Sequence, residues 1–348
     1  MNVWTFQPEN FGELLPYVRD DLVTDINFNG IDVWIDHLYR GRYRADIKLS
    51  EDFVSQFATR ISNVVSKSFN KFNNLLEAET ETLRVSIIHE SVACTGTSIS
   101  IRKTSPARRL TEDSMLKDGY CVPEMLVFLE NCIRAHMNLI MTGLPGSGKT
   151  ELLKFLTKYI PENERVITIE DNLEIHYRSI NPQKDCVELK VNEEFFDYTK
   201  AIKSCLRQNP KWIMLSEARS TEVKYLLEAM STGTHCLTTL HTDDVNKVPD
   251  RIQNMMKDTV STQRIENDVF SFVDAGILIR KGADLGEGIR RYMDQICFYS
   301  RENGKNKIVM MAEGGSIINR SLPPDIKRKF SFAGIDDPFL SKERMNEL

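Results

Sequence analysis

The segment from Gly143 to Thr150 reads Gly-Leu-Pro-Gly-Ser-Gly-Lys-Thr and fits the pattern G-x-x-x-x-G-K-[ST] at every fixed position. Glycines let such a loop curl so that its backbone N–H groups face a phosphate, while the lysine reaches the terminal phosphates and the threonine hydroxyl ligates Mg²⁺. An apolar stretch at 139–142 precedes the loop, and a helix predicted over 149–159 would point its positive N-terminal end at the same anion. The sequence therefore predicts a phosphate-binding loop formed by Gly143, Leu144, Pro145, Gly146, Ser147, Gly148, Lys149 and Thr150.

Strands and helices alternate through the part of the chain that carries this loop. Residues 121–348 predict a mostly parallel α/β sheet, with strands at 139–142, 166–169, 212–215 and 236–240 and shorter β segments at 292–299 and 307–312. Residues 1–103 predict a separate α+β domain with strands at 24–28, 31–35, 82–88 and 97–102. Asn29-Gly30 predicts a tight hairpin turn there, and Ser50 predicts the start of a helix. Residues 104–120 are polar and lack periodicity, which favours a flexible linker.

Composition restricts the kind of partner. The net charge is −5 with a pI near 5.8, which argues against a dedicated nucleic-acid binder. No run approaches the ~18 apolar residues of a membrane-spanning helix, and the first residues do not read as a signal peptide. We therefore expect a cytoplasmic protein with no direct nucleic-acid binding, and work at a membrane surface stays open at this point.

Three polar groups follow predicted parallel strands, where an α/β sheet places its ligands. Glu174 lies in the acidic run Ile-Glu-Asp-Asn-Leu-Glu after strand 166–169, Glu217 follows strand 212–215, and His241 follows strand 236–240. Hydrolysis of a bound triphosphate needs a carboxylate to orient water, and positive charge for the transition state. A zinc site at His235, Cys236 and His241 is not favoured, because adjacent residues on a strand point to opposite faces.

Four motifs in this order resemble the type II/type IV secretion ATPase superfamily, whose members drive secretion, conjugation and pilus assembly. They are the stretch 138–143 running into the loop, the acidic run 169–174, Leu-Arg-Gln-Asn-Pro (206–210) leading to Ser-Glu-Ala-Arg (216–219), and Thr-Leu-His-Thr (239–242). The acidic run and the first domain look most similar to the type IV secretion and tight-adherence pilus branch. The absence of a four-cysteine cluster argues against the type II branch that carries a zinc module.

The resemblance implies an N-terminal α+β domain, a hinge, a C-terminal RecA-like domain and a hexameric ring that uses ATP and Mg²⁺. It implies Glu174 as general base, Glu217 as support for the metal or the water, and His241 as sensor of the γ-phosphate. Thr150 and Glu217 would hold the metal. Arg84 and Arg102 match arginines that the family brings to the nucleotide from its first domain. Inner-membrane components of a secretion or pilus machine are the implied partners.

The chain departs from the family pattern at three places. Lys211 stands where Asp is usual, Ser216 replaces Gly before the second acid, and Thr234 follows Gly233 where His is usual, so that His235 comes one place late. None of these removes a group with an assigned chemical role. Two other functions stay open at this point: a RecA-like nucleic-acid motor, and a nucleotide-gated scaffold with little turnover.

Overall fold

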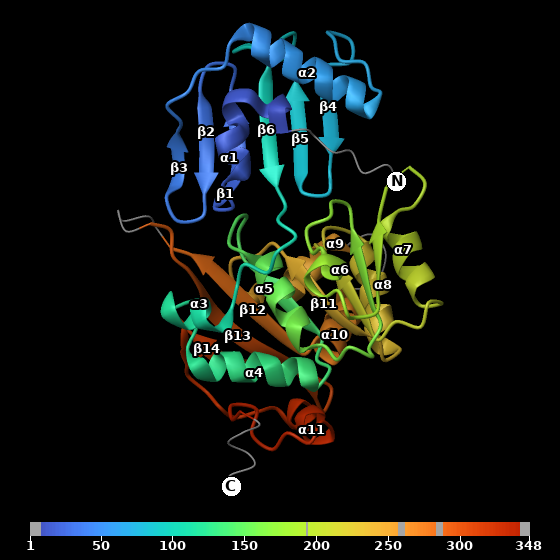
Figure 1. Ribbon diagram of the computed structural model, residues 1–348. Helices are drawn as coiled ribbons and strands as arrows, with labels where there is room; N and C mark the ends of the chain where they lie inside the picture. The colour runs from blue at the N-terminus through green and yellow to red at the C-terminus, as the bar shows by residue number, and fades with distance from the viewer. Residues whose placement is uncertain (1–7, 193, 257–261, 283–287, 342–348) are drawn as a thin grey trace. The chain divides into compact units, whose positions relative to one another are not determined.

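The computed structural model describes residues 8–192, 194–256, 262–282 and 288–341. The chain forms two compact units (Figure 1). The first lies within Met1–Pro106 and Ala283–Ile289, and the second within Ala107–Gly282 and Arg290–Leu348. Residues 1–7, at the start of the first predicted domain, and residues 342–348, at the end of the second, lie outside the described residues. Among those described, no helix is both long and apolar enough to span a bilayer.

The first unit is built on a six-stranded antiparallel sheet of order β3-β2-β1-β6-β5-β4. Its strands are β1 (Val23–Phe28), β2 (Val33–His37), β3 (Gly41–Arg44), β4 (Leu75–Glu79), β5 (Leu83–Ile88) and β6 (Ser98–Lys103). Alternate residues of β2, β5 and β6 are buried, which is the pattern of a sheet with one covered face. The covering elements are the 3-10 segment η1 (Pro8–Leu14), α1 (Leu15–Arg19) and α2 (Glu51–Val65).

The sequence located this unit's main helix and four of its strands. Ser50 caps α2, since its hydroxyl accepts a hydrogen bond from the Phe53 N–H. The predicted tight turn at Asn29-Gly30 is present, since β1 and β2 pair antiparallel and the Asn29 N–H donates to the Asp32 carbonyl, but β2 begins at Val33 and not at Ile31. The Asn29 side-chain oxygen accepts the N–H groups of Ile31 and Asp32 there, which leaves the Ile31 side chain exposed. Strands β3 and β4 were not predicted.

The second unit contains a nine-stranded sheet of order β15-β14-β13-β12-β7-β11-β10-β8-β9. The strands from β12 to β9 in that order run parallel, and β13, β14 and β15 pair antiparallel at the other end. The bounds are β7 (Leu139–Thr142), β8 (Val166–Glu170), β9 (Cys186–Lys190), β10 (Trp212–Leu215), β11 (His235–Leu240), β12 (Ala275–Lys281), β13 (Arg291–Glu302), β14 (Lys305–Glu313) and β15 (Ser316–Ile317). The predicted strands are present, whereas β9, β12 and β15 were missed.

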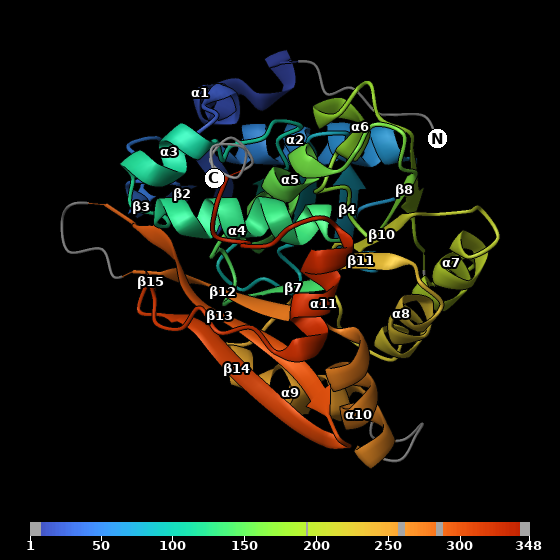
Figure 2. The ribbon, with the colours of Figure 1, turned by 90° about the horizontal axis from the view of Figure 1, so that it is seen from below.

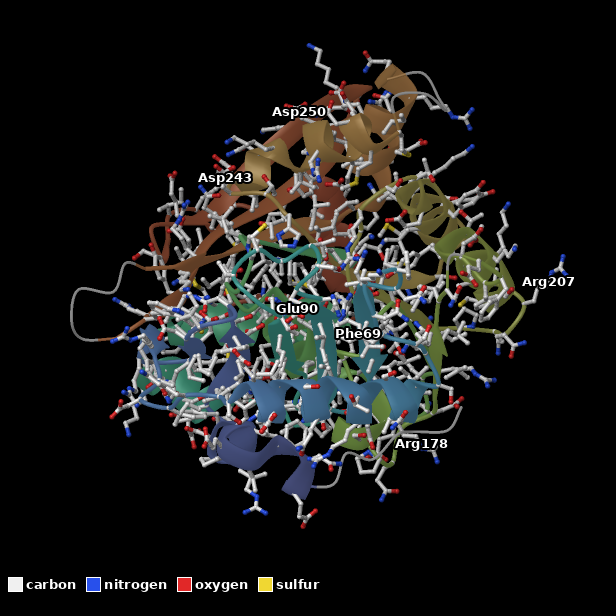
Figure 3. The ribbon with its side chains drawn as sticks, turned by 90° about the horizontal axis from the view of Figure 1, so that it is seen from above. Phe69, Glu90, Arg178, Arg207, Asp243 and Asp250 are labelled. Carbon is white, nitrogen blue, oxygen red and sulfur yellow. The ribbon has the colours of Figure 1, made fainter. Side chains whose placement is uncertain are left out.

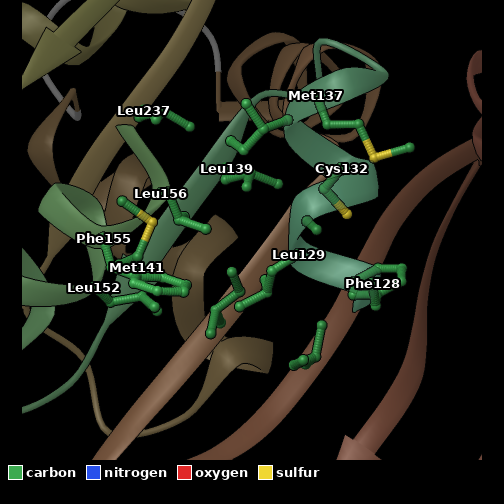
Figure 4. Close-up of a cluster of buried hydrophobic side chains, with 14 of the residues drawn as sticks. Phe128, Leu129, Cys132, Met137, Leu139, Met141, Leu152, Phe155, Leu156 and Leu237 are labelled. Carbon is green, nitrogen blue, oxygen red and sulfur yellow. The ribbon is translucent and has the colours of Figure 1, made fainter. Parts of the chain in front are cut away.

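Helices cover both faces of this sheet, which Figure 2 shows nearly edge-on. One face packs against α4 (Pro123–Arg134), α5 (Lys149–Leu156) with the 3-10 turn η2 (Thr157–Tyr159), and α11 (Pro324–Phe332). Figure 4 shows part of that core, in which side chains of α4 and α5 lie near Leu139 and Met141 of β7 and Leu237 of β11. The opposite face packs against α7 (Tyr198–Cys205), α8 (Glu222–Ser231), α9 (Val248–Met255) and α10 (Thr262–Phe272). The short segments α6 (Tyr177–Ile180) and η3 (Val245–Lys247) complete the unit. Every residue of β7, β8 and β10 is buried, and burial on both faces explains why apolar residues predominate in these strands.

The predicted linker 104–120 differs from the structure in its extent. Residues from Ala107 onward belong to the second unit, and α3 (Glu112–Lys117) begins at a capping box formed by Thr111 and Ser114. The Arg108 guanidinium is held against the second unit by hydrogen bonds to the Lys154 carbonyl, at 3.1 Å, and to the Asn181 side-chain oxygen, at 2.8 Å. Most of the predicted linker, from Ala107 to residue 120, therefore belongs to the second unit, and only residues 104–106 of it do not.

Candidate active site

The loop that we predict to bind phosphate connects β7 to α5, which is the strand–loop–helix order that the sequence predicts. Gly143 has φ 149°, and a Cβ there would come within 2.4 Å of the Ser147 hydroxyl and 2.5 Å of the Ile279 carbonyl. Gly146 and Gly148 have φ values of 73° and 98°, and a Cβ on Gly146 would meet nothing within 4 Å. Only glycine adopts these angles without strain. The curled loop thus leaves open space beside it and ends at the N-terminus of α5, where an anion is favoured.

Lys149 is buried at the base of this loop. Its Nζ donates to the carbonyls of Gly143 and Leu144, at 3.0 and 3.3 Å, and lies 3.2 Å from Nδ1 of His241. Burial lowers the pKa of Lys149 to about 8, although the nearby carboxylates of Glu217 and Glu174 act in the opposite direction. A cation this poorly solvated is ready to be stabilised by an incoming phosphate.

The acids predicted at successive strand ends lie close to the loop. Glu174, in the connection after β8, has its Oε2 3.3 Å from the Thr150 hydroxyl. Glu217, directly after Ser216 at the end of β10, has its Oε1 2.9 Å from Nε2 of His241. Strands β8, β10 and β11 are neighbours in the sheet and parallel, so their carboxyl ends meet at one edge. Three elements that are far apart in sequence therefore converge on Lys149 and Thr150.

His241 joins the lysine to the second acid. Because the Lys149 ammonium can only donate, Nδ1 of His241 accepts, and Nε2 then carries the hydrogen that points at Glu217. Burial and the Lys149 charge lower the pKa of His241, which favours this neutral tautomer. An imidazole between the phosphate-binding lysine and a carboxylate is placed to respond when the lysine changes partners.

Arg219 and Asp171 extend the site beyond what the sequence predicted. The Arg219 guanidinium donates to Oε2 of Glu217 at 2.8 Å and to Oδ2 of Asp171 at 2.6 Å, and these two carboxylates raise its pKa. Arg219 thus links the end of β10 to the acidic run after β8. No contact of Arg219 could be assigned from the sequence, because its partner Asp171 is 48 residues away along the chain. Arg207, quoted in the same motif, projects outward from the molecule (Figure 3).

Arg84 and Arg102 belong to the first unit. They face each other as direct partners in the register of β5 and β6. Arg84 lies 3.7 Å from Glu77, and Arg102 lies 2.9 Å from Asp25. Both side chains are substantially exposed, so they form a paired cationic position on one face of the first sheet.

The donor set around the loop fits Mg²⁺ bound with a triphosphate. Magnesium takes oxygen ligands and usually keeps one or two protein ligands, with phosphates and water completing its octahedron. The Thr150 hydroxyl and the carboxylates of Glu174 and Glu217 are the oxygen donors gathered near Lys149. The buried Ser147 hydroxyl has no hydrogen-bond partner within the described part of the chain, as expected for a loop that awaits a polar ligand.

Solved structures with a similar fold include an ATPase and a pilus retraction motor. The Legionella pneumophila ATPase DotB gives a TM-score of 0.59 at 20% identity, over 83% of this chain and 80% of that one. The pilus retraction motor PilT with bound ADP gives 0.58 at 19% identity, over 80% and 81%. At these identities the similarity shows the fold, and it confirms the predicted α/β class with an N-terminal domain and a RecA-like domain.

Sequence relatives agree with the fold. An uncharacterised Bacillus anthracis protein is 26% identical over 292 residues, which is 80% of this chain and 66% of that protein. The type IV secretion system protein VirB11 of Bartonella quintana is 28% identical over 159 residues, or 44% of each chain. The chain spans 66%, 31% and 48% of the first three curated relatives that it matches. The family model described as "Type II/IV secretion system protein" matches residues 70–315. That match covers most of the chain and includes every motif quoted above, so the protein belongs to the type II/IV secretion system protein family.

Proposed function

We propose that this protein is an ATPase whose ATP-dependent conformational cycle powers a membrane-associated secretion, conjugation or pilus machine. The observation that carries the proposal is the convergence of Thr150 with Glu174, and of Lys149 with His241 and Glu217, at one edge of the second sheet. Phosphate binding, water activation and a group that senses the phosphate are thereby available at a single position. A loop that only bound phosphate would not need all three.

In this proposal, the phosphates of ATP replace the loop carbonyls and His241 as partners of Lys149. Thr150, with support from Glu217, would hold Mg²⁺, which would supply positive charge to the phosphates. Glu174 acts as general base on the attacking water, because its carboxylate lies 3.3 Å from the Thr150 hydroxyl at the end of the predicted phosphate-binding loop. His241 then reports the change, since losing its contact with Lys149 alters its hydrogen bond to Glu217.

The arginines of the first unit complete the proposed site. Arg84 and Arg102 would approach the terminal phosphates when the two units close, supplying the positive charge that phosphoryl transfer needs. Their side-by-side register supports this role, because one movement of the sheet would deliver both. Hydrolysis would remove the bridge and let the units separate. In a hexameric ring, this cycle would transmit force to inner-membrane partners from the cytoplasmic side.

Turnover assays test the catalytic part of the proposal. We expect ATPase activity in the unaltered protein, loss of nucleotide binding in Lys149→Ala, and retained binding with little turnover in Glu174→Gln. Glu188→Gln on β9 is the matched control, because among the described residues its side chain accepts a hydrogen bond from the Arg178 N–H and has no contact with Lys149, Thr150 or Glu174. Tight ATP binding with no turnover in the unaltered protein would instead indicate a nucleotide-gated scaffold.

Size measurements test the ring. We expect the mass in solution to rise toward a hexamer when a non-hydrolysable ATP analogue and Mg²⁺ are added, and to stay low for Lys149→Ala. A monomer under all conditions would refute the ring. Turnover that increases several-fold with added DNA would point to a nucleic-acid motor instead.

A further inference from the structure

Glu170 is a buried carboxyl group to which the mechanism above gives no role. It is the last residue of β8 and is fully buried, with 0% of its surface exposed. Its Oε2 accepts two backbone hydrogen bonds, from the Glu174 N–H at 2.9 Å and from the Ile175 N–H at 3.0 Å. Its Oε1 is also buried and has no hydrogen-bond partner within the described residues.

These two hydrogen bonds hold the backbone of the acidic run in a turn. The chain leaves β8 at Glu170, turns, and is tied back to the same side chain four and five residues later. Glu174 is therefore fixed through its own backbone N–H, and its carboxylate points from that fixed position to the Thr150 hydroxyl. The other end of the turn is held separately, because the Asp171 N–H donates to the Tyr198 hydroxyl at 3.0 Å.

We propose that Glu170 is a positioning residue for ATP hydrolysis: it fixes the backbone at Glu174 and Ile175 and so aims the Glu174 carboxylate at the nucleotide site. This inference rests on the proposed function, in which Glu174 activates water. Glu170 touches no substrate in this account. It acts only through the turn that it holds.

The charge state of Glu170 follows from its surroundings. Burial raises its pKa to about 8, the ionised carboxylates of Glu174 and Glu188 act in the same direction, and the two backbone N–H groups oppose it. A neutral carboxylic acid with one accepting oxygen resembles a glutamine amide, whereas methionine has a similar volume and no acceptor.

The experiment compares Glu170→Gln and Glu170→Met, with Glu188→Gln as the control for removing a nearby acid. We expect Glu170→Met to lower kcat roughly 100-fold, which is the scale of the loss when a catalytic group is displaced. The ATP dissociation constant should change by less than about threefold, which corresponds to less than ~0.7 kcal/mol of binding free energy. Glu170→Gln should recover most of that kcat, because its amide oxygen accepts the same two N–H groups. Equal kcat values in Glu170→Met and the unaltered protein would overturn the inference.

A second measurement does not depend on any variant folding. In the unaltered protein, the amide hydrogens of Glu174 and Ile175 should exchange slowly with solvent, on the timescale of the neighbouring strand β8. Exchange of these two amides at the rate of an open loop would overturn the inference even if Glu170→Met could not be prepared. Full ATP hydrolysis by Glu174→Gln would refute the proposed role of Glu174 as general base. That outcome is distinguishable from a failure of the inference about Glu170, which concerns only the position of Glu174.

Discussion

Lys149 gives a pH-dependent nucleotide affinity that can be calculated from its surroundings. Burial lowers its pKa to about 8 in the nucleotide-free protein. A bound triphosphate would favour the ammonium and return its pKa to about 10.4 or above. The protonated fraction of free Lys149 then falls from about nine tenths at pH 7 to about one tenth at pH 9. If only the ammonium binds phosphate, the affinity falls about tenfold across that range, or ~1.4 kcal/mol.

Calorimetric titration with ADP or an ATP analogue, in the presence of a chelator so that no metal enters the site, measures this directly. Proton uptake on binding should rise from about 0.1 per site at pH 7 to about 0.9 at pH 9. His241 adds no charge change in this window, because its lowered pKa keeps it neutral. Lys149→Arg is the control, since a guanidinium stays charged throughout. A flat affinity in the unaltered protein, or the same fall in Lys149→Arg, would refute the reasoning.

Three further outcomes follow from the contacts described. Glu217→Gln should retain nucleotide binding but hydrolyse ATP slowly, because it weakens the Arg219 and His241 contacts; filter binding and phosphate release measure the two properties. Arg84→Ala and Arg102→Ala should each lower kcat, by as much as roughly 10³-fold if they meet the phosphates, and full turnover in both would exclude the bridging role. Asn138→Ala should lower the free energy of unfolding by about 2–6 kcal/mol. Its buried side chain bonds the Cys236 N–H and the Phe272 carbonyl, and denaturant titration measures the loss.

The sequence predicted those features of the candidate site that are contiguous in the chain or that lie at the ends of predicted strands. The phosphate-binding loop is contiguous, and its glycines, lysine and threonine have fixed spacing. Glu217 and His241 each follow a predicted strand, and the carboxyl ends of parallel strands lie at one edge of a sheet. The sequence therefore predicted that both residues lie near Lys149. Their direct 2.9 Å contact was not predicted, because it depends on β10 and β11 being neighbours in the sheet.

Other features required the tertiary structure. Arg219 reaches Asp171 across 48 residues, a pairing that no spacing indicates. Glu170 reads in sequence as one more acid in a polar run, although it is the fifth buried residue of a strand buried throughout. Strand β9 was missed because its residues are only partly buried and include Glu188 and Lys190, as suits the edge of a sheet. Helix α11 was missed in a polar segment whose Lys329 is paired with the buried Asp274.

Arg108 shows how the start of the second unit is connected to the nucleotide site. Its guanidinium bonds the Lys154 carbonyl near the end of α5, the helix whose first residue is Lys149. It also bonds Asn181 and the Ile180 carbonyl, which end the segment that begins with the acidic run. A shift of α5 or of that segment must therefore move Arg108 or break its hydrogen bonds. Arg108 is the second residue of the second unit, so these hydrogen bonds tie the start of that unit to the candidate nucleotide site.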